Sequence, residues 1–187
     1  MKTPPHLTLG LVGEPLTGKD TLAAYLVEQY GFVHVSTGDF VRFYILENNL
    51  GEPTRPLLKH VANKLRTEHG PDYFAQLALR NEATHLVISG LRNPHEVAAI
   101  RSAGGTILAL TAPLEVRYAR AQERGRATDN LSFEEFKRQQ TAEDTSSNPN
   151  AQNMAEVLAM ADISLSNTAG RIALHQHIDD MLVNLLQ

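Results

Sequence analysis

The chain has 187 residues, of which 42% are hydrophobic and 20% charged, a balance that fits one globular domain with a substantial core. Its formal net charge of -4 argues against a general nucleic-acid binder, which usually carries a basic excess. The absence of cysteine from the sequence excludes disulfides, thiolate metal sites and a cysteine nucleophile.

Short apolar segments alternate with longer amphipathic ones along the chain. The short segments are rich in Val, Ile and Leu and end at Gly, Ser or Thr, which is typical of buried strands; they span 7–13, 32–36, 85–90, 106–111 and 161–166. Segments with helical character lie between or after them and span 20–30, 94–103, 113–124 and 169–186. Because the apolar runs are continuous, we predict an α/β fold: a five-stranded parallel sheet with helices on both faces.

Two segments interrupt this alternation, and both are interpreted as insertions into one domain spanning 1–187. The first, at about 38–82, has room for three helices, and the second, at about 120–150, is polar and flanked by arginines. The apolar run near the start of the chain is too short for a signal sequence or a membrane span. The sequence therefore predicts a cytoplasmic protein without membrane or nucleic-acid partners.

The segment GLVGEPLTGKDT, residues 10–21, follows the first predicted strand and opens a predicted helix. It nearly fits the phosphate-binding pattern G-x-x-x-x-G-K-[ST], but Asp20 stands at the hydroxyl position. Backbone N–H groups of such a loop bind phosphate oxygens, and Lys19 adds a full positive charge. The alternative is a glycine-rich turn with a solvated lysine. We predict an ATP site formed by Gly13, Glu14, Pro15, Leu16, Thr17, Gly18, Lys19, Asp20 and Thr21.

The segment VSTGDFVR, residues 35–42, resembles the STGDxxR segment of adenylate kinases. The resemblance implies that Thr37 and Arg42 contact the acceptor nucleotide, with Gly38 and Asp39 beside them. Independently, a Thr-Gly turn exposes backbone N–H groups, and an arginine four residues beyond the glycine can bind phosphate bidentately. The alternative is a helix start capped by a hydroxyl, with Arg42 exposed.

The segment ISGLRNPHEV, residues 88–97, resembles segments of adenylate kinases and of archaeal adenylate-kinase-like and dephospho-CoA-kinase-like proteins. The resemblance implies that Arg92 binds the acceptor phosphate. Ser89 stands where those families carry an aspartate near magnesium, and Glu96 stands where adenylate kinases carry a glutamine that recognises adenine. A carboxylate at position 96 would favour a base with an exocyclic amino group, such as cytosine. Equally, Glu96 can be a helix-start carboxylate facing the helix dipole.

Arginines recur on one face of the predicted helix 113–124. Arg117, Arg120 and Arg124 are spaced i, i+3 and i+7, and Arg126 follows a glycine that can end the helix. Like charges on one face repel unless an anion lies between them. The ERGR segment resembles the lid of nucleoside monophosphate kinases, which implies that Arg120, Arg124 and Arg126, ahead of Arg117, close over the donor phosphates. The alternative is a solvated basic face.

The resemblance runs from about Leu7 to Gly170, and its last pattern, N-x-x-G, places Asn167 near the donor base. It implies a P-loop kinase fold with an acceptor-binding insertion and a short lid. The implied reaction is phosphoryl transfer from ATP to a nucleoside or deoxynucleoside monophosphate, giving ADP and a diphosphate. The residues expected to be catalytic are Lys19, Arg92, Arg120, Arg124 and Arg126. Two alternatives stay open: transfer to a hydroxyl, as in dephospho-CoA kinase, with Asp39 as base, and an ATP-binding regulatory protein that transfers nothing.

Asp20 is the predicted metal ligand. The usual hydroxyl at this position ligates the Mg²⁺ that bridges the β- and γ-phosphates, and a carboxylate is a hard oxygen donor able to do the same. GKDT loops also resemble those of phage deoxynucleoside monophosphate kinases and phosphomevalonate kinases. Thr21 cannot simply replace the hydroxyl, because one helical residue turns the side chain by roughly 100°. We therefore expect Mg²⁺ as the cofactor, held through Asp20.

Overall fold

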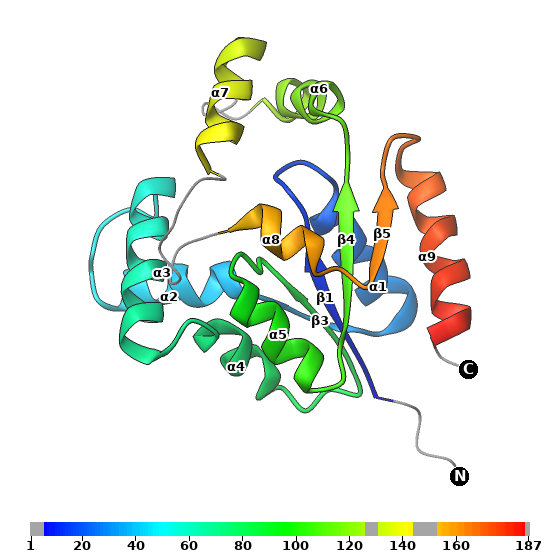
Figure 1. Cartoon of the computed structure of the whole chain (residues 1–187), viewed down its shortest axis with the longest axis horizontal. Coiled ribbons are helices and arrows are strands. Elements are labelled where there is room, and N and C mark those ends of the chain that lie inside the picture. The colour runs from blue at the N-terminus through cyan, green and yellow to red at the C-terminus, as the bar shows by residue number, and fades with distance from the viewer. Residues whose placement is uncertain (1–5, 126–130, 144–152, 186–187) are drawn as a thin grey trace.

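Five strands form one parallel sheet in the order β2-β3-β1-β4-β5 (Figure 1). The computed structural model describes residues 6–125, 131–143 and 153–185, without the side chains of 141–143 and 184. The strands are β1 Leu7–Val12, β2 Val33–Ser36, β3 His85–Ser89, β4 Thr106–Thr111 and β5 Ile163–Ser166. The α/β fold with a five-stranded parallel sheet, predicted from the apolar segments, is confirmed.

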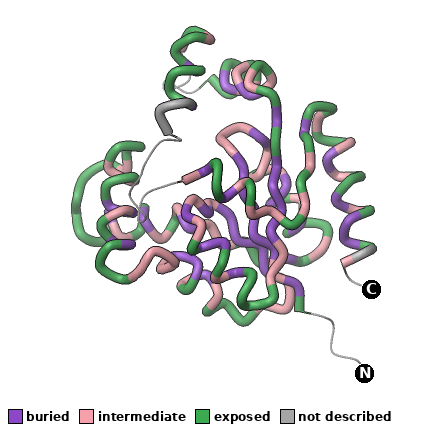
Figure 2. The backbone as a smooth tube through the Cα atoms, in the orientation of Figure 1, coloured by how far each residue is buried: buried purple, intermediate pink, exposed green. Residues whose placement is uncertain are grey.

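The three central strands are buried on both faces. Leu9 of β1 on one face, and Ile88 of β3 and Ile107 of β4 on the other, are fully buried, and Figure 2 shows the buried backbone concentrated in the sheet. The edge strands differ, since β2 and β5 include exposed residues. An edge strand has a neighbour on one side only, so continuous apolar character describes the centre of this sheet and not its two borders.

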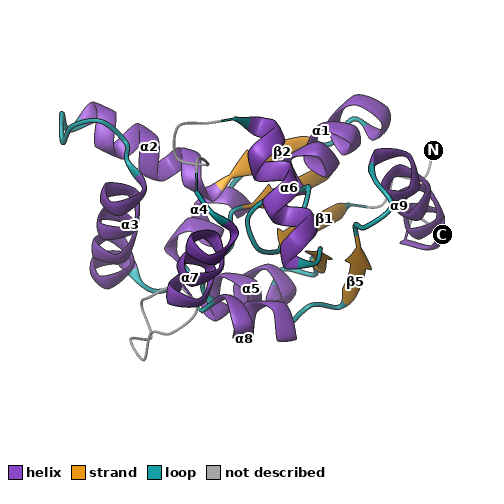
Figure 3. Ribbon diagram, turned by 90° about the horizontal axis from the view of Figure 1, so that it is seen from above, coloured by secondary structure: helices purple, strands orange, loops and turns teal. Residues whose placement is uncertain are grey.

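Helices cover both faces of the sheet (Figure 3). On one face α1 (Lys19–Tyr30) and α9 (Arg171–Leu185) pack with residues of β1 and β4 in one apolar cluster. On the other face α4 (Tyr73–Leu79), α5 (Pro94–Ser102) and α8 (Met154–Ala159) share a second cluster with β1, β3 and β4. No helix in the described part of the chain combines the length and apolar character required to cross a membrane.

The predicted insertion at about 38–82 contains α2 (Thr37–Glu47), α3 (Arg55–His69) and α4. These three helices have an apolar cluster of their own, which includes Ile45, Leu65 and Phe74. α2 and α3 therefore form a small layer beside the sheet, at the left of Figure 1, and α4 packs both against them and against the sheet.

The second predicted insertion begins with α6 (Leu114–Arg124), which follows β4, and continues with α7 (Phe133–Glu143). Figure 1 shows both helices beyond the carboxyl ends of the strands, above the loop that joins β1 to α1. Residues 126–130 and 144–150 of the lid predicted at about 120–150, among them Arg126, lie outside the described residues.

Candidate active site

The phosphate loop, defined here as residues 13–20, joins β1 to α1 and depends on glycine at two positions. Gly13 and Gly18 have φ values of 151° and 102°, in the range that side chains disfavour. A Cβ atom on Gly13 would lie 2.4 Å from the carbonyl oxygen of Leu110, and one on Gly18 would lie 2.5 Å from Nδ2 of Asn167. The loop is thus packed directly against β4 and the residue that follows β5.

Lys19 folds back over the phosphate loop. Its Nζ donates hydrogen bonds to the carbonyl oxygens of Gly13, at 2.7 Å, and Glu14, at 2.8 Å. Burial, followed by the positive charge of Arg92, lowers the pKa of the Lys19 ammonium to about 8. At neutral pH Lys19 is still mainly charged, so it presents a positive group that has lost much of its hydration to a phosphate entering the loop.

The hydroxyl of Thr17 shapes the loop from inside. Thr17 is fully buried, and its Oγ1 donates to the carbonyl oxygen of Glu14 at 2.9 Å. Asn167, predicted beside the donor base, is also buried, and its Nδ2 donates to the carbonyl oxygen of Thr17 at 2.8 Å. Both side chains support the loop backbone, whose free N–H groups are the expected phosphate ligands.

A cavity of about 540 Å³ lies beside the phosphate loop, and we call it the donor cavity. Its wall includes residues that the sequence predicted for the ATP site and for the lid. They are Leu16, Gly18, Lys19, Asp20, Thr21 and Asn167 of the predicted ATP site, and Arg120 and Arg124 of the predicted lid. Arg120 is attached to the loop, because its guanidinium donates to the carbonyl oxygens of Leu16 and Asn167 at 3.1 and 2.9 Å. Arg124 lies one turn further along the same helix.

Arg117, which the lid resemblance ranked behind the other arginines, lies on the buried face of α6. Its Nη1 donates to Oε1 of Gln140 at 2.7 Å, and its Nη2 donates to Oε1 of Glu14 at 2.9 Å. The side chain therefore connects α6 to both α7 and the phosphate loop. Glu14 was predicted as part of the ATP site, and the structure shows its carboxylate bound to Arg117.

Asp20 lies in the first turn of α1, is exposed, and lines the donor cavity together with Thr21. Within the described ranges, no group of three or more His, Cys, Asp or Glu side chains is placed to hold a metal ion by itself. Mg²⁺ in phosphotransferases is bound by one or two carboxylates together with substrate phosphates. Two carboxylates, those of Asp20 and Glu123, line the donor cavity. Asp20, directly after Lys19 in the first turn of α1, fits that arrangement as a protein ligand.

A second cavity, of about 380 Å³, lies between the insertion and the end of β3, and we call it the acceptor cavity. The predicted residues Thr37, Gly38, Arg42 and Arg92 are all on its wall. Arg92 lies close enough to Lys19 for its charge to lower the lysine pKa, so it stands between the acceptor cavity and the phosphate loop. Asp39 is not on the wall; it is exposed and pairs with Arg42 at 2.6 Å.

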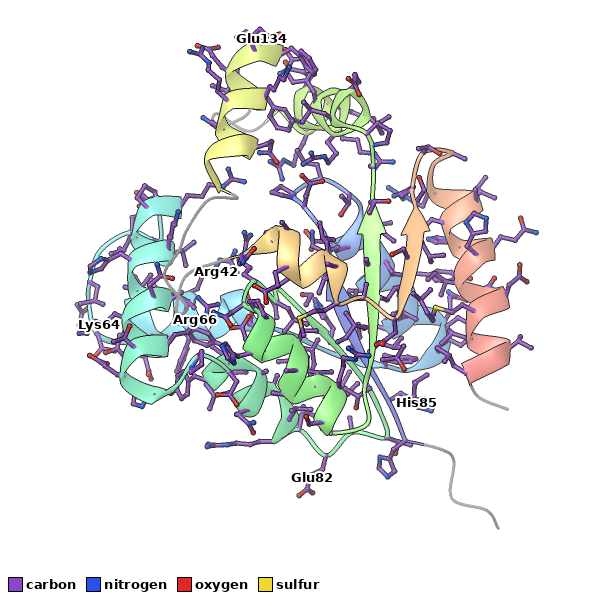
Figure 4. The ribbon with its side chains drawn as sticks, in the orientation of Figure 1. Arg42, Lys64, Arg66, Glu82, His85 and Glu134 are labelled. Carbon is purple, nitrogen blue, oxygen red and sulfur yellow. The ribbon has the colours of Figure 1, made fainter. Side chains whose placement is uncertain are left out.

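Three further cationic side chains, which the sequence analysis did not identify, line the acceptor cavity. They are Arg55, Lys59 and Arg66, all on α3. Their spacing of four and seven residues places them on one helix face, and this periodicity was the available signal. Figure 4 shows Arg66 and Arg42 on the side of the molecule formed by the insertion.

Glu96 is fully buried and does not have the role that its alignment with an adenine-recognising glutamine suggested. Its Oε1 accepts from Nε and Nη2 of Arg66 at 3.0 and 2.8 Å. Its Oε2 accepts from the backbone N–H groups of Arg92 and Asn93 at 2.8 and 3.1 Å, which completes a capping box at the start of α5. The helix-start alternative is the right description, and a direct contact of Glu96 with an acceptor base does not fit its burial.

The sheet, the glycine-lysine loop at the β1–α1 junction and the two adjoining cavities define a P-loop nucleotide-binding domain with a kinase-like fold. The chain belongs to the UPF0200 family. In a separate comparison, its residues 9–145 match a family model described as an AAA domain. A UPF0200 protein of Methanoculleus marisnigri is 33% identical over 69% of this chain and 73% of its own length. A UPF0200 protein of Pyrobaculum aerophilum is 30% identical over 95% of this chain and 97% of its own length.

The chain is also 32% identical, over 95% of its length, to a UPF0200/UPF0201 protein of Archaeoglobus fulgidus, of which it spans 55%. Among solved structures, TT1252 from Thermus thermophilus aligns over 99% of this chain and 100% of its own, with a TM-score of 0.64 and 21% identity. A shikimate kinase from Acinetobacter baumannii, solved with shikimate, aligns over 97% of this chain and 95% of its own, with a TM-score of 0.56 and 14% identity. These similarities support the P-loop kinase fold and do not single out adenylate kinases.

Proposed function

We propose that this protein transfers the γ-phosphoryl group of ATP to the phosphate of a nucleoside or deoxynucleoside monophosphate. The observation that carries the proposal is the charge of the acceptor cavity. Among the described residues, its wall contains five cationic side chains and no carboxylate; the cations are Arg42, Arg55, Lys59, Arg66 and Arg92, of which Arg42 and Arg66 pair with Asp39 and Glu96 outside the wall. An acceptor that brings its own negative charge matches this wall, and a phosphate bound by Arg92 would be next to the phosphate loop.

The reaction asks the protein mainly for positioning and charge stabilisation. An oxygen of the acceptor phosphate forms the new bond to the γ-phosphorus, and the bond to the β–γ bridging oxygen breaks, so that ADP leaves with the electron pair. The acceptor oxygen is already deprotonated, so no general base is required. Lys19 would bind the transferring group from the loop, and Arg124 would approach it from α6. Mg²⁺ held by Asp20 would neutralise phosphate charge when bound.

The hydroxyl-acceptor alternative is less well supported by this geometry. A hydroxyl must lose a proton during transfer, so a base has to reach it. Asp39, the residue expected for that role, is exposed, pairs with Arg42 and is absent from the cavity wall. A regulatory protein that only binds ATP would need a single nucleotide site. That alternative gives no function to the acceptor cavity and its five cationic side chains.

The test is a transfer assay with γ-labelled ATP, Mg²⁺ and a panel of ribo- and deoxynucleoside monophosphates together with dephospho-CoA and shikimate. Transfer to a monophosphate supports the proposal. Transfer to dephospho-CoA or shikimate alone would replace it with a hydroxyl kinase, and ATP binding without transfer to any compound would leave a regulatory protein. A Lys19→Met protein, purified identically, reports any contaminating kinase.

A further inference from the structure

Arg66 lies on the wall of the acceptor cavity with part of its guanidinium unused. The side chain is 3% exposed, and its Nε and Nη2 both donate to Glu96. Its third nitrogen, Nη1, is buried and has no hydrogen-bond partner among the described residues. Arg66 thus lines the cavity, is almost completely buried and keeps one N–H group without a partner among the described residues, which points to a ligand atom that accepts from it when the cavity is filled.

The surroundings hold the guanidinium in one orientation. Its Cζ lies 5.0 Å from the centre of the Phe74 ring, and Phe74 also lines the cavity. Its partner Glu96 is fixed in turn by the two backbone N–H groups at the start of α5. The pair is neutral as a unit, so what Arg66 offers to a ligand is chiefly a directed N–H donor, rather than the unpaired charge that a phosphate requires.

This donor distinguishes two classes of nucleobase. Guanine O6 and the O4 atoms of uracil and thymine are hydrogen-bond acceptors, whereas adenine and cytosine carry an amino group at the equivalent position. A carbonyl oxygen would accept from Nη1. An amino group would place donor against donor and leave the buried N–H without a partner.

We propose that Arg66 selects the acceptor by hydrogen bonding to the O6 or O4 carbonyl oxygen of its base, so that the preferred substrates are guanine, uracil or thymine monophosphates. The inference rests on the proposed function and names the substrate class of that site. It reverses the preference for an exocyclic amino group that a free carboxylate at Glu96 would give, because that carboxylate is already used by Arg66 and the helix start.

The test compares GMP, UMP and dTMP with AMP and CMP in two measurements. The first is kcat/KM for transfer from ATP, and the second is equilibrium binding of each monophosphate by calorimetry without ATP. The informative variant is Arg66→Met combined with Glu96→Gln, because glutamine maintains the capping box and no charge is left buried alone. Arg66→Lys, which keeps the positive charge but loses Nη1, is the second variant should the double variant fail to fold.

The control is Lys59→Met, which removes an exposed cation from the same cavity and helix. We expect the wild-type protein to favour GMP, UMP and dTMP over AMP and CMP by about tenfold or more, as loss of one hydrogen bond to a charged donor implies. This ratio should fall to within about threefold in both Arg66 variants. Lys59→Met should weaken all five acceptors alike and leave the ratio unchanged.

The outcomes separate this inference from the proposed function. Transfer that favours AMP or CMP, or a ratio that Arg66→Lys does not change, would overturn the role of Arg66 and leave the kinase proposal intact. Binding with the expected preference but without transfer would refute the kinase proposal and support the base recognition. Failure of all five monophosphates to bind or react would overturn both.

Discussion

The imidazole Nε2 of His34, on β2, and the hydroxyl of Ser89, at the end of β3, lie 2.8 Å apart. Ser89 is nearly fully buried and stands where the adenylate-kinase-like families carry an aspartate. A neutral hydroxyl therefore occupies the end of the strand that, in those families, brings a carboxylate toward magnesium. Partial removal of the imidazole from water lowers the pKa of His34, against the opposing effect of Asp20 and Asp39.

Replacing Ser89 by aspartate should raise the pKa of His34. A carboxylate within hydrogen-bonding distance favours the imidazolium form and would outweigh the loss of hydration that now lowers this pKa. The measurement is an NMR titration of the histidine ring protons in wild-type and Ser89→Asp proteins. Ser89→Asn is the matched control, because it changes size without adding charge and should leave the titration midpoint lower. Equal midpoints for the two variants would show that position 89 does not interact with His34 in solution.

Arg92→Ala and Arg42→Ala should both impair use of the acceptor while ATP binding stays nearly unchanged. Each variant loses a charge-assisted contact expected to contribute about 1.5 to 3 kcal/mol, or roughly 10- to 150-fold in kcat/KM for the acceptor. The loss should be larger for Arg92, since its charge also acts on Lys19, whereas Arg42 is exposed and pairs with Asp39. Steady-state kinetics and ATP titrations check this. Loss of ATP binding with normal acceptor kinetics would refute the assignment.

Arg117 and Arg124 lie on the same helix and should have different roles. Arg117→Met removes hydrogen bonds to Glu14 and Gln140, so it should lower the free energy of unfolding by about 1.5 to 3 kcal/mol. Arg124→Ala, at the donor cavity, should slow transfer and increase the fraction of ATP lost to water, with little change in stability. Chemical denaturation and product analysis measure the two effects. The lid interpretation fails if Arg124→Ala transfers phosphate at the parent rate.

Local patterns in the sequence were sufficient for the sheet, the phosphate loop and some of the residues that line the two cavities, but not for the three cations of α3. They were not sufficient for Glu96, because its partner Arg66 lies 30 positions away and meets it only after the insertion packs against α5. Arg117 and Glu14 are 103 positions apart, so their pairing likewise depends on the folded arrangement. Charged side chains on one helix face are visible in a sequence, but which of them become paired is decided by long-range packing.

Asp179 should make stability depend on acid pH. Its carboxylate accepts hydrogen bonds from Tyr30 at 2.6 Å and Tyr25 at 2.7 Å, and these bonds lower the pKa of Asp179. A depressed carboxyl pKa contributes stability above the unfolded value, near 4, which is lost as pH falls further. Asp179→Asn should therefore be less stable than the parent at pH 7, and the difference should shrink below about pH 4. Parallel unfolding curves over this range, with a constant difference, would contradict the linkage.

Asp20 should control the magnesium requirement. It is the carboxylate of the phosphate loop that lines the donor cavity, and Ser89 supplies none at the end of β3. Asp20→Ala should keep the fold but require much more Mg²⁺ and transfer slowly, whereas Asp20→Ser, which restores the usual hydroxyl donor, should retain more activity. The measurement is transfer rate against Mg²⁺ concentration for the three proteins, with circular dichroism to verify folding. Ser89→Asp in the Asp20→Ala background should recover part of the lost Mg²⁺ affinity by returning a carboxylate to β3. If Asp20→Ala matches the parent at low Mg²⁺, Asp20 is only a helix-start carboxylate, and the ion is bound through other oxygens.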